Sequence, residues 1–155
     1  MNDVNPDWKQ AAREMAGSCY ALRLRMSSRV VTGIYEEAMR GRGVTAAQLN
    51  LLAAIGSTPG VRPTDLGTTL KLDPSTLSRN LKRMREREWI DERIGEDARN
   101  SHLYLSDGGK RSLSELYGSW RAAQLRVEEL LGELAASVPE LADVLAGSGG
   151  FPRSG

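Results

Sequence analysis

Hydrophobic residues recur at steps of three and four along the first forty residues, which is the spacing of one face of an α-helix. The residues that form this face are Met15, Cys19, Leu22, Met26, Val30 and Ile34. They predict one long helix from Pro6 to Arg40. Gly41 and Gly43 follow directly, and glycine is a common helix terminator, so we expect the helix to end there.

Three shorter helices are then predicted by their start signals. Thr45 and Gln48 fit a capping box, in which each side chain satisfies a free amide at the helix start. Pro63 suits the first position of a second helix. Asp73 before Pro74 gives the third helix a capping carboxylate and a proline in its first turn. Only a few residues separate the second helix from the third.

The third of these helices is amphipathic. At 100° per residue, Leu77, Leu81 and Met84 fall on one side. The opposite side carries Ser75, Arg79, Lys82 and Arg83. Between residues 74 and 87, five basic residues stand against one acidic residue, the charge pattern expected where a protein meets a polyanion. Taken alone, such a stripe is more often a solvated helix face.

The period changes at Trp89. Two short β-prone runs, 89–94 and 102–105, are joined by a segment rich in turn formers, which predicts a β-hairpin. Ser106 and Asp107 can cap a final long helix, and Pro139 starts one more short helix through Leu145. The apolar positions of the long helix are Leu113, Leu116, Trp120, Ala123, Val127, Leu130 and Leu134. The tail 147–155 is rich in Gly, Ser and Pro and is expected to be disordered.

Two short helices joined by a tight turn, with a hairpin directly after them, form a winged helix-turn-helix. We therefore predict a mainly α fold, with this DNA-binding region over residues 45–106. Long dimerisation helices are predicted on either side, in residues 1–44 and 107–146. Their apolar stripes are too extensive for one winged helix to cover, so a second copy of the chain is the expected partner.

The DNA-contacting residues follow from this geometry. The N-terminal end of a recognition helix reaches base edges in the major groove, and longer basic side chains reach phosphates. The predicted recognition set is Ser75, Thr76, Ser78, Arg79, Lys82 and Arg83. The predicted wing set is Arg93, Asp97 and Arg99. Arg99 at the hairpin tip can enter a minor groove, and Asp97 can pair with it and orient its guanidinium.

At these residues the sequence resembles the multiple-antibiotic-resistance regulator (MarR) family of bacterial winged-helix repressors, from Cys19 to about Gln124. The resemblance rests on four groups of residues besides the stretch from Leu22 to Tyr35. They are Gly43, Val44, Thr45 and Gln48; Asp73, Ser75, Thr76, Leu77, Arg79, Asn80 and Leu81; Asp97 and Arg99; and Leu105, Ser106 and Gly109. The chain departs from the family at Ala98, where a second arginine is common, and at Ser106, where threonine is usual.

The resemblance implies a homodimer that binds double-stranded DNA at a pseudo-palindromic operator. It also implies a repressor that a small phenolic or other aromatic ligand releases from DNA. On this reading the ligand lies between the dimer and DNA-binding regions, and its candidate pocket residues here are Tyr20, Arg23, Tyr35 and Trp120.

Composition limits the alternatives. Cys19 and His102 are the only cysteine and histidine, so the chain cannot assemble a Cys/His zinc cluster or an internal disulfide. No nucleophile and base pair, phosphate loop or paired carboxylates stand at a meaningful spacing, so we expect neither an enzyme nor a cofactor. The sequence contains no secretion signal and no membrane span, which favours a cytoplasmic protein.

Two other functions remain open at this stage. The first is a winged-helix module that binds protein, although the cationic recognition helix speaks against it. The second is a thiol-responsive regulator that uses Cys19. Because Cys19 lies on the apolar stripe of the first helix, we expect it to be buried and inert.

Overall fold

The computed structural model of the chain describes residues 7–95 and 101–146. The predicted wing residues Asp97 and Arg99, and the tail 147–155, lie outside the described residues. In chain order the described elements are α1 (Trp8–Ser18), α2 (Tyr20–Ala38), α3 (Ala46–Ser57), α4 (Pro63–Thr69), α5 (Pro74–Glu86), β1 (Ile90–Ile94), β2 (Ser101–Leu105), α6 (Asp107–Leu131), the 3-10 helix η1 (Gly132–Ser137) and α7 (Val138–Ala146).

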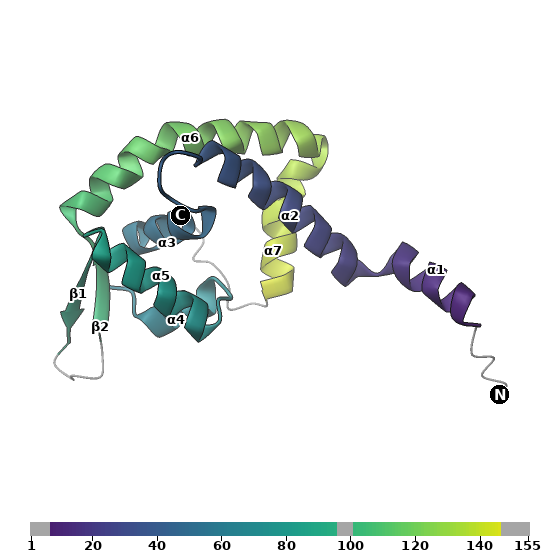
Figure 1. Ribbon diagram of the computed structural model, residues 1–155, viewed down its shortest axis with the longest axis horizontal. Helices are drawn as coiled ribbons and strands as arrows, with labels where there is room; N and C mark the ends of the chain where they lie inside the picture. Colours follow the sequence, from purple (N-terminus) through teal and green to yellow (C-terminus); the bar gives the residue numbers. More distant parts are fainter. Residues whose placement is uncertain (1–6, 96–100, 147–155) are drawn as a thin grey trace.

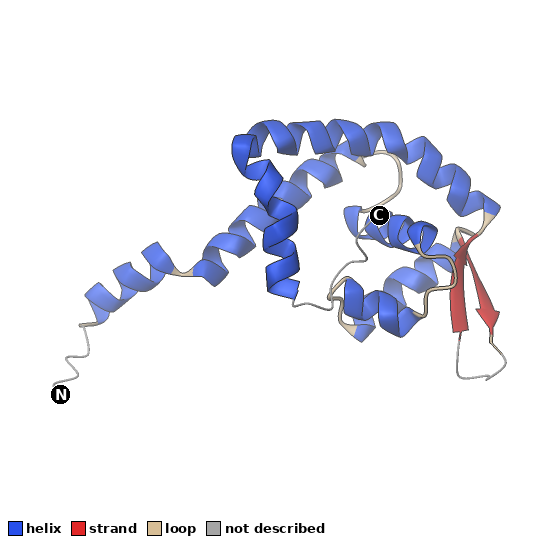
Figure 2. Ribbon diagram, turned by 180° about the vertical axis from the view of Figure 1, so that it is seen from behind, coloured by secondary structure: helices blue, strands red, loops and turns tan. Residues whose placement is uncertain are grey.

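The helices form two groups (Figure 1). Helix α6 lies alongside α2 and above α3, while α4 and α5 lie below α3 with the hairpin at their side. Helix α1 projects away from the rest of the chain. Figure 2 shows the same arrangement from behind, with the two strands at the edge of the helical body. The predicted fold class, a mainly helical winged helix-turn-helix, is confirmed.

The core joins α3, α4, α5 and the hairpin. Its fully buried side chains include Leu52 and Ile55 of α3, Leu66 of α4, Met84 of α5 and Leu103 of β2. The same cluster includes Met39, and Leu116 of α6, so the winged region and the first half of α6 share one hydrophobic core. The core fixes α5 and the hairpin relative to each other, which is what a DNA-binding surface requires.

The predicted helix starts are present. Thr45 and Gln48 form the complete capping box of α3. Pro63 occupies the first turn of α4. The Asp73 carboxylate accepts a hydrogen bond from the backbone N–H of Thr76 at 2.9 Å and caps α5. The side-chain caps satisfy amides that a helix start otherwise leaves without a partner.

The two strands pair antiparallel, from Ile90 with Leu105 to Ile94 with Ser101. Val61, in the segment before α4, adds an isolated bridge to Leu103. Backbone hydrogen bonds from both sides hold this bridge, so the base of the hairpin is fixed to the helix-turn-helix. The wing therefore has a rigid base on the helical core.

The prediction of one helix from Pro6 to Arg40 is wrong, because Cys19 interrupts it. Cys19 adopts an extended backbone conformation, with φ −67° and ψ 109°, between α1 and α2. Gly17 and Ser18 precede it, and both residue types favour a helix interior less than alanine does. Helical periodicity continues across this interruption, so the apolar pattern alone does not reveal it.

The expectation that Cys19 is buried is also wrong for the single chain. Cys19 is exposed, as are Met15, Met26 and Val30 on the same predicted stripe. The physical reason is that α1 and the first part of α2 extend beyond the body, where the described residues do not cover them. At the other end of the fold, Leu134 lies in η1 rather than in the long helix, which ends at Leu131.

Candidate nucleic-acid interface

The N-terminal end of α5 is organised by its capping residue. Asp73 accepts the Ser75 hydroxyl hydrogen bond at 2.6 Å as well as the Thr76 backbone bond. These bonds, that from Ser75 first, hold the pKa of the Asp73 carboxyl well below its ordinary value. Ser75 is exposed and Thr76 is half-buried, so the predicted base-reading end of the helix is in place at the surface.

The Arg79 side chain points back toward the N-terminal end of α5, to residues one turn earlier. Its Nε donates to the Ser75 carbonyl at 3.3 Å, and its Nη2 donates to the Thr76 hydroxyl at 3.4 Å. Both bonds are long, so they hold the guanidinium only weakly. Arg79 lies at the surface, and its strong donors can be transferred to a ligand at small cost.

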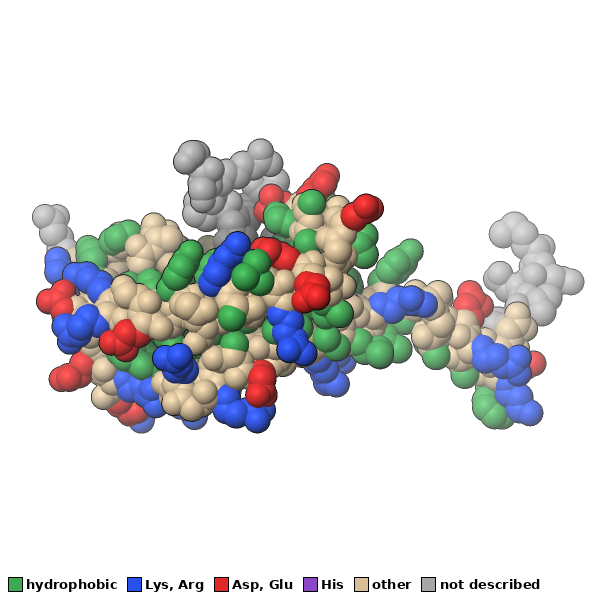
Figure 3. Space-filling model, turned by 90° about the horizontal axis from the view of Figure 1, so that it is seen from above, with side chains coloured by type: hydrophobic (Ala, Val, Ile, Leu, Met, Phe, Trp, Pro, Cys, Tyr) green, Lys and Arg blue, Asp and Glu red, His purple; other side chains and the backbone are tan. Residues whose placement is uncertain are grey.

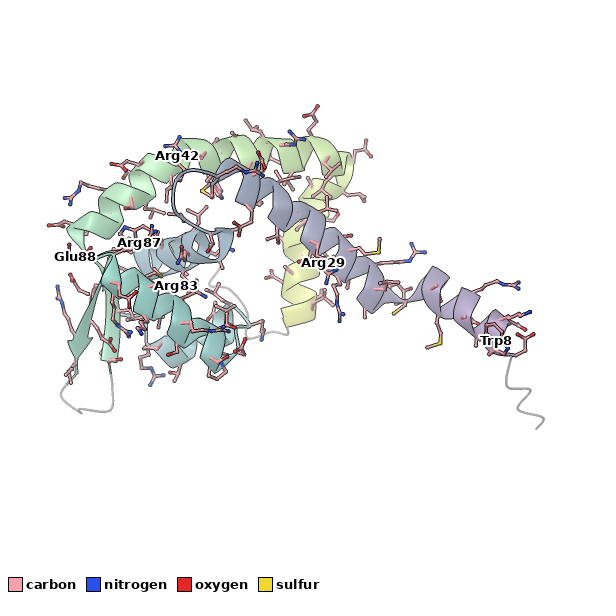
Figure 4. All side chains as sticks on the ribbon, in the orientation of Figure 1. Trp8, Arg29, Arg42, Arg83, Arg87 and Glu88 are labelled. Atoms are coloured by element: carbon pink, nitrogen blue, oxygen red, sulfur yellow. The ribbon has the colours of Figure 1, made fainter. Side chains whose placement is uncertain are left out.

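The remaining predicted residues of the recognition helix lie along its length. Ser78 faces the groove between α4 and α5, and Lys82 lies 3.9 Å from Glu86, an exposed pair of little energetic value. Arg83 lies in the last turn, close to the end of α5 (Figure 4). The apolar residues Leu77, Leu81 and Met84 are buried on the opposite side, as the periodicity predicts.

The wing strand carries one predicted cation that the structure describes. The guanidinium of Arg93 lies over the Tyr104 ring at 4.4 Å, a cation–π contact that orients the side chain on the outer face of the hairpin. On the other face, Arg85 of α5 pairs with Glu92 at 2.6 Å. A hydrogen bond from Ser101 and then the charge of Arg85 lower the pKa of Glu92. This pair, which sequence reasoning missed, joins the recognition helix to the wing.

His102 lies within β2, half-buried as expected of a strand residue. Its Nδ1 is 2.8 Å from the Gly60 carbonyl oxygen, so in the matching tautomer it donates a hydrogen bond there.

A β-carbon built on Gly60 lies 3.0 Å from the Tyr104 hydroxyl. Gly60 also has φ +84°, and it is therefore suited to this position both by conformation and by space.

The four candidate ligand-pocket residues do not gather in the single chain. Tyr20 is 83% exposed at the start of α2, and Arg23 donates to the Gly17 carbonyl beside the break at Cys19. Tyr35 lies fifteen residues further along α2, about 22 Å from Tyr20 at 1.5 Å per residue. Trp120 packs at the edge of the core. The first two residues are thus well separated from Tyr35.

Tyr35 instead joins α2 to α6. Its hydroxyl donates to Gln124 Oε1, and Gln124 Nε2 donates to Glu128 Oε1 at 3.2 Å. Burial and then the charge of Glu128 raise the pKa of the Tyr35 hydroxyl, so it stays protonated and acts as a donor. Trp120 is one helical turn from Gln124, which places it near this chain of hydrogen bonds.

Three surface cavities accompany these elements. One of about 680 Å³ lies between α4 and α5, and one of about 470 Å³ lies between α2 and α6. The third, of about 1010 Å³, lies between α3, α4 and the base of β2. The four predicted pocket residues line none of these three cavities.

Comparison with known proteins identifies the central part of the chain. Residues 42–100, which include α3, α4, α5 and β1, match the model of the MarR family. This region is similar to the MarR family. The family is one of DNA-binding transcription regulators. A comparison with curated protein sequences gave no match.

Solved structures extend the MarR likeness to most of the chain. The transcriptional regulator MosR of M. tuberculosis, solved in complex with DNA, is 27% identical with a TM-score of 0.73, and the match covers 83% of this chain and 94% of that one. The transcriptional repressor CouR, solved bound to a 23-mer DNA duplex, is 21% identical with a TM-score of 0.76, covering 86% and 96%. MarR from E. coli, in its apo form, is 19% identical with a TM-score of 0.68, covering 83% and 97%. The last two matches show a shared fold.

Residues 7–95 and 101–146 also bear on two other kinds of site. Among these residues, no helix is long and apolar enough to cross a membrane. In the same ranges, no group of three or more His, Cys, Asp and Glu side chains is arranged to hold a metal ion.

Proposed function

We propose that the chain is a transcription regulator that binds a pseudo-palindromic DNA site as a homodimer. The observation that carries this proposal is α5, whose buried apolar side is fixed to the core while Ser75, Ser78, Arg79 and Lys82 face solvent. Helix α5 has the width that a major groove admits, and the adjacent wing reaches the neighbouring groove. In a bacterial cell such a regulator works in the cytoplasm, where the chromosome lies.

Exposed hydrophobic side chains support the homodimer. With the exception of Ile94, the large hydrophobic residues that are exposed in the described chain lie on the N-terminal and C-terminal helices. Figure 3 shows hydrophobic side chains at the surface of both the body and the projecting N-terminal arm. The exposed hydrophobic residues of these helices include Trp8, Met15, Met26, Val30, Leu130, Leu134, Leu141 and Val144. Apolar surface of this extent marks an association site, and a two-fold dimer is the commonest solution.

The proposal is tested by selecting fragments of the source genome that bind the full-length chain. Footprinting of the selected fragment is expected to show two related half-sites, about 10 base pairs or a multiple of this distance apart, because each protomer presents one recognition helix. Competition with random DNA at low and high salt then measures specificity. A chain that prefers no fragment over competitor, even at low salt, contradicts the proposal.

We further propose that the regulator is a repressor and that a small aromatic ligand weakens its binding. The resemblance to the MarR family supports this part of the proposal. The likeness to CouR, itself a transcriptional repressor, concerns the fold. A panel of aromatic acids, added to the complex with the selected fragment, is expected to contain a compound that releases DNA. If all compounds leave the affinity unchanged while DNA binding is intact, ligand control by this class fails.

Thiol control is a second candidate for regulation, because Cys19 is exposed in the single chain, at the junction of α1 and α2. Only an accessible thiol can be oxidised readily. Treatment with peroxide, followed by a reducing agent, is expected to change DNA binding reversibly in the wild-type chain and to leave Cys19→Ser unaffected. An equal response of both proteins rules out a role for Cys19.

A further inference from the structure

Two residues other than glycine have positive φ in the described chain. They are Lys71, with φ 52°, and Glu88, with φ 54°. Residues with a β-carbon adopt this left-handed conformation at a cost, because the β-carbon approaches the following carbonyl oxygen. Lys71 precedes α5 by three residues and Glu88 follows it by two, so the two positions bracket the recognition helix.

Both residues terminate a helix in the same way. After α4, the N–H of Lys71 donates to the Thr68 carbonyl, and the N–H of Leu72 donates to the Gly67 carbonyl. This pair of bonds is the Schellman motif, in which glycine is the preferred residue at the left-handed position.

The motif is repeated after α5. There the N–H of Glu88 donates to the Arg85 carbonyl, and the N–H of Trp89 donates to the Met84 carbonyl. The two helix ends are therefore matched in backbone geometry. They differ in the charge of the residue that stands where glycine is favoured.

Lys71 lies at the end of α5 that is proposed to enter the groove. It lines the cavity between α4 and α5 together with Thr64, Pro74 and Ser78, and Ser78 belongs to the proposed DNA-binding face. The Lys71 side chain is exposed, and no acidic residue of the described chain forms an ion pair with it. Glu88 lies beyond the other end of α5, about 20 Å away along thirteen residues of helix (Figure 4).

We propose that Lys71 is an additional DNA contact that binds a backbone phosphate beside the N-terminal end of the recognition helix. The inference rests on the proposed DNA-binding function. An uncharged glycine relieves the strain of this turn, whereas lysine places a long, mobile cation next to Ser78 and the start of α5. A flexible ammonium suits a phosphate, which requires charge rather than a fixed geometry. Lysine at this position thus makes the turn less stable than glycine would, and it raises the affinity of the protein for DNA.

The experiment compares Lys71→Gly with Glu88→Gly in the full-length chain. Both variants relieve the same strain, so both are expected to raise the melting temperature by about 2–4 °C. Only Lys71→Gly removes a phosphate contact. In a homodimer this loss occurs twice, and each contact contributes about 0.9 to the slope of log affinity against log salt.

The salt slope of Lys71→Gly is therefore expected to fall by about 2, and its affinity at 0.15 M salt by about thirtyfold, equally on the selected fragment and on random DNA. Glu88→Gly is expected to keep the wild-type slope and to lose no affinity. Lys71→Arg, which keeps the charge, is expected to bind as the wild type does. Lys71→Asn, which tolerates positive φ but has no charge, is expected to bind as Lys71→Gly does.

Two results overturn the inference: a Lys71→Gly variant with the wild-type affinity and slope, or a loss confined to the selected fragment, which indicates a base contact. If Lys71→Gly proves unstable, the comparison of Lys71→Arg with Lys71→Asn decides the role of the charge. A wild-type chain that binds no duplex is a different result, since it removes the proposed function itself.

Discussion

A single missing side chain at Gly109 allows α6 to start where it does. The Ser106 hydroxyl accepts a hydrogen bond from the Gly109 N–H at 3.0 Å and donates to the Glu88 carbonyl. A β-carbon built on Gly109 lies only 2.0 Å from the Trp89 carbonyl oxygen. The Leu-Ser-x-x-Gly pattern therefore has a physical reason: serine caps the helix, and glycine lets its first turn approach the backbone of Trp89, between α5 and β1.

We predict that Gly109→Ala lowers the free energy of unfolding by about 3 kcal/mol, because backbone must move to admit the methyl group. Gly118 provides the control. It lies on the same helix, and a β-carbon built there has nothing within 4 Å, so Gly118→Ala is expected to raise the free energy of unfolding by about 0.5–1 kcal/mol. Urea denaturation measures both. Equal stability of Gly109→Ala and the wild type would mean that the start of α6 shifts freely.

Asp73 gives a prediction in pH. Its pKa is lower in the folded chain than in the unfolded chain, where an aspartate titrates near 4, so its contribution to stability is complete above about pH 5 and is lost as the pH falls toward the folded value. Asp73→Asn retains a capping oxygen without this titration. The melting temperature of the wild type, relative to that of Asp73→Asn, should therefore fall between about pH 5 and pH 2. A difference that is independent of pH contradicts the assigned cap.

At the scale of elements, the proposed function assigns different roles to two cations of α5, Arg79 and Lys82. Arg79, near the N-terminal end, is predicted to read a base, so Arg79→Ala is expected to cost about 1–3 kcal/mol on the selected fragment and to relax preference at one base pair. Lys82→Ala is expected to weaken all sequences alike and to lower the salt slope by about one unit per protomer. Titrations on both DNAs separate these outcomes. Equal losses on selected and random DNA for both variants would reject the assignment.

The elements show which features local sequence specifies. Thr45 and Asp73 act through neighbouring amides, so their caps are legible in a few residues. The interruption at Cys19 is not, because the apolar period continues through it. The positive φ of Lys71 is not visible in the sequence either, because glycine is the residue expected at such a position. Tyr20 and Tyr35 are a third case: they are far apart along α2 in the single chain, and their shared ligand pocket stays a prediction.

At the scale of the whole molecule, the terminal helices are expected to be buried by a second chain. The double variant Leu130→Glu, Leu134→Glu places charges on the exposed apolar surface at the C-terminal end and is expected to yield monomers that bind the selected fragment weakly. Ile94→Gln, which changes an exposed hydrophobic residue of the wing, is expected to remain dimeric. Analytical ultracentrifugation distinguishes the two. A dimeric double variant would place the subunit interface elsewhere.

The close approach of Gly109 to Trp89 also couples the start of α6 to the link that follows α5. With 25 residues the helix is about 37 Å long, and its first turn lies against the backbone of Trp89, in the short link between α5 and β1. A tilt of about 5° at the far end displaces the near end by about 3 Å, roughly the step from one base pair to the next. In the proposed homodimer, small rearrangements among the terminal helices are therefore expected to change the separation of the two recognition helices.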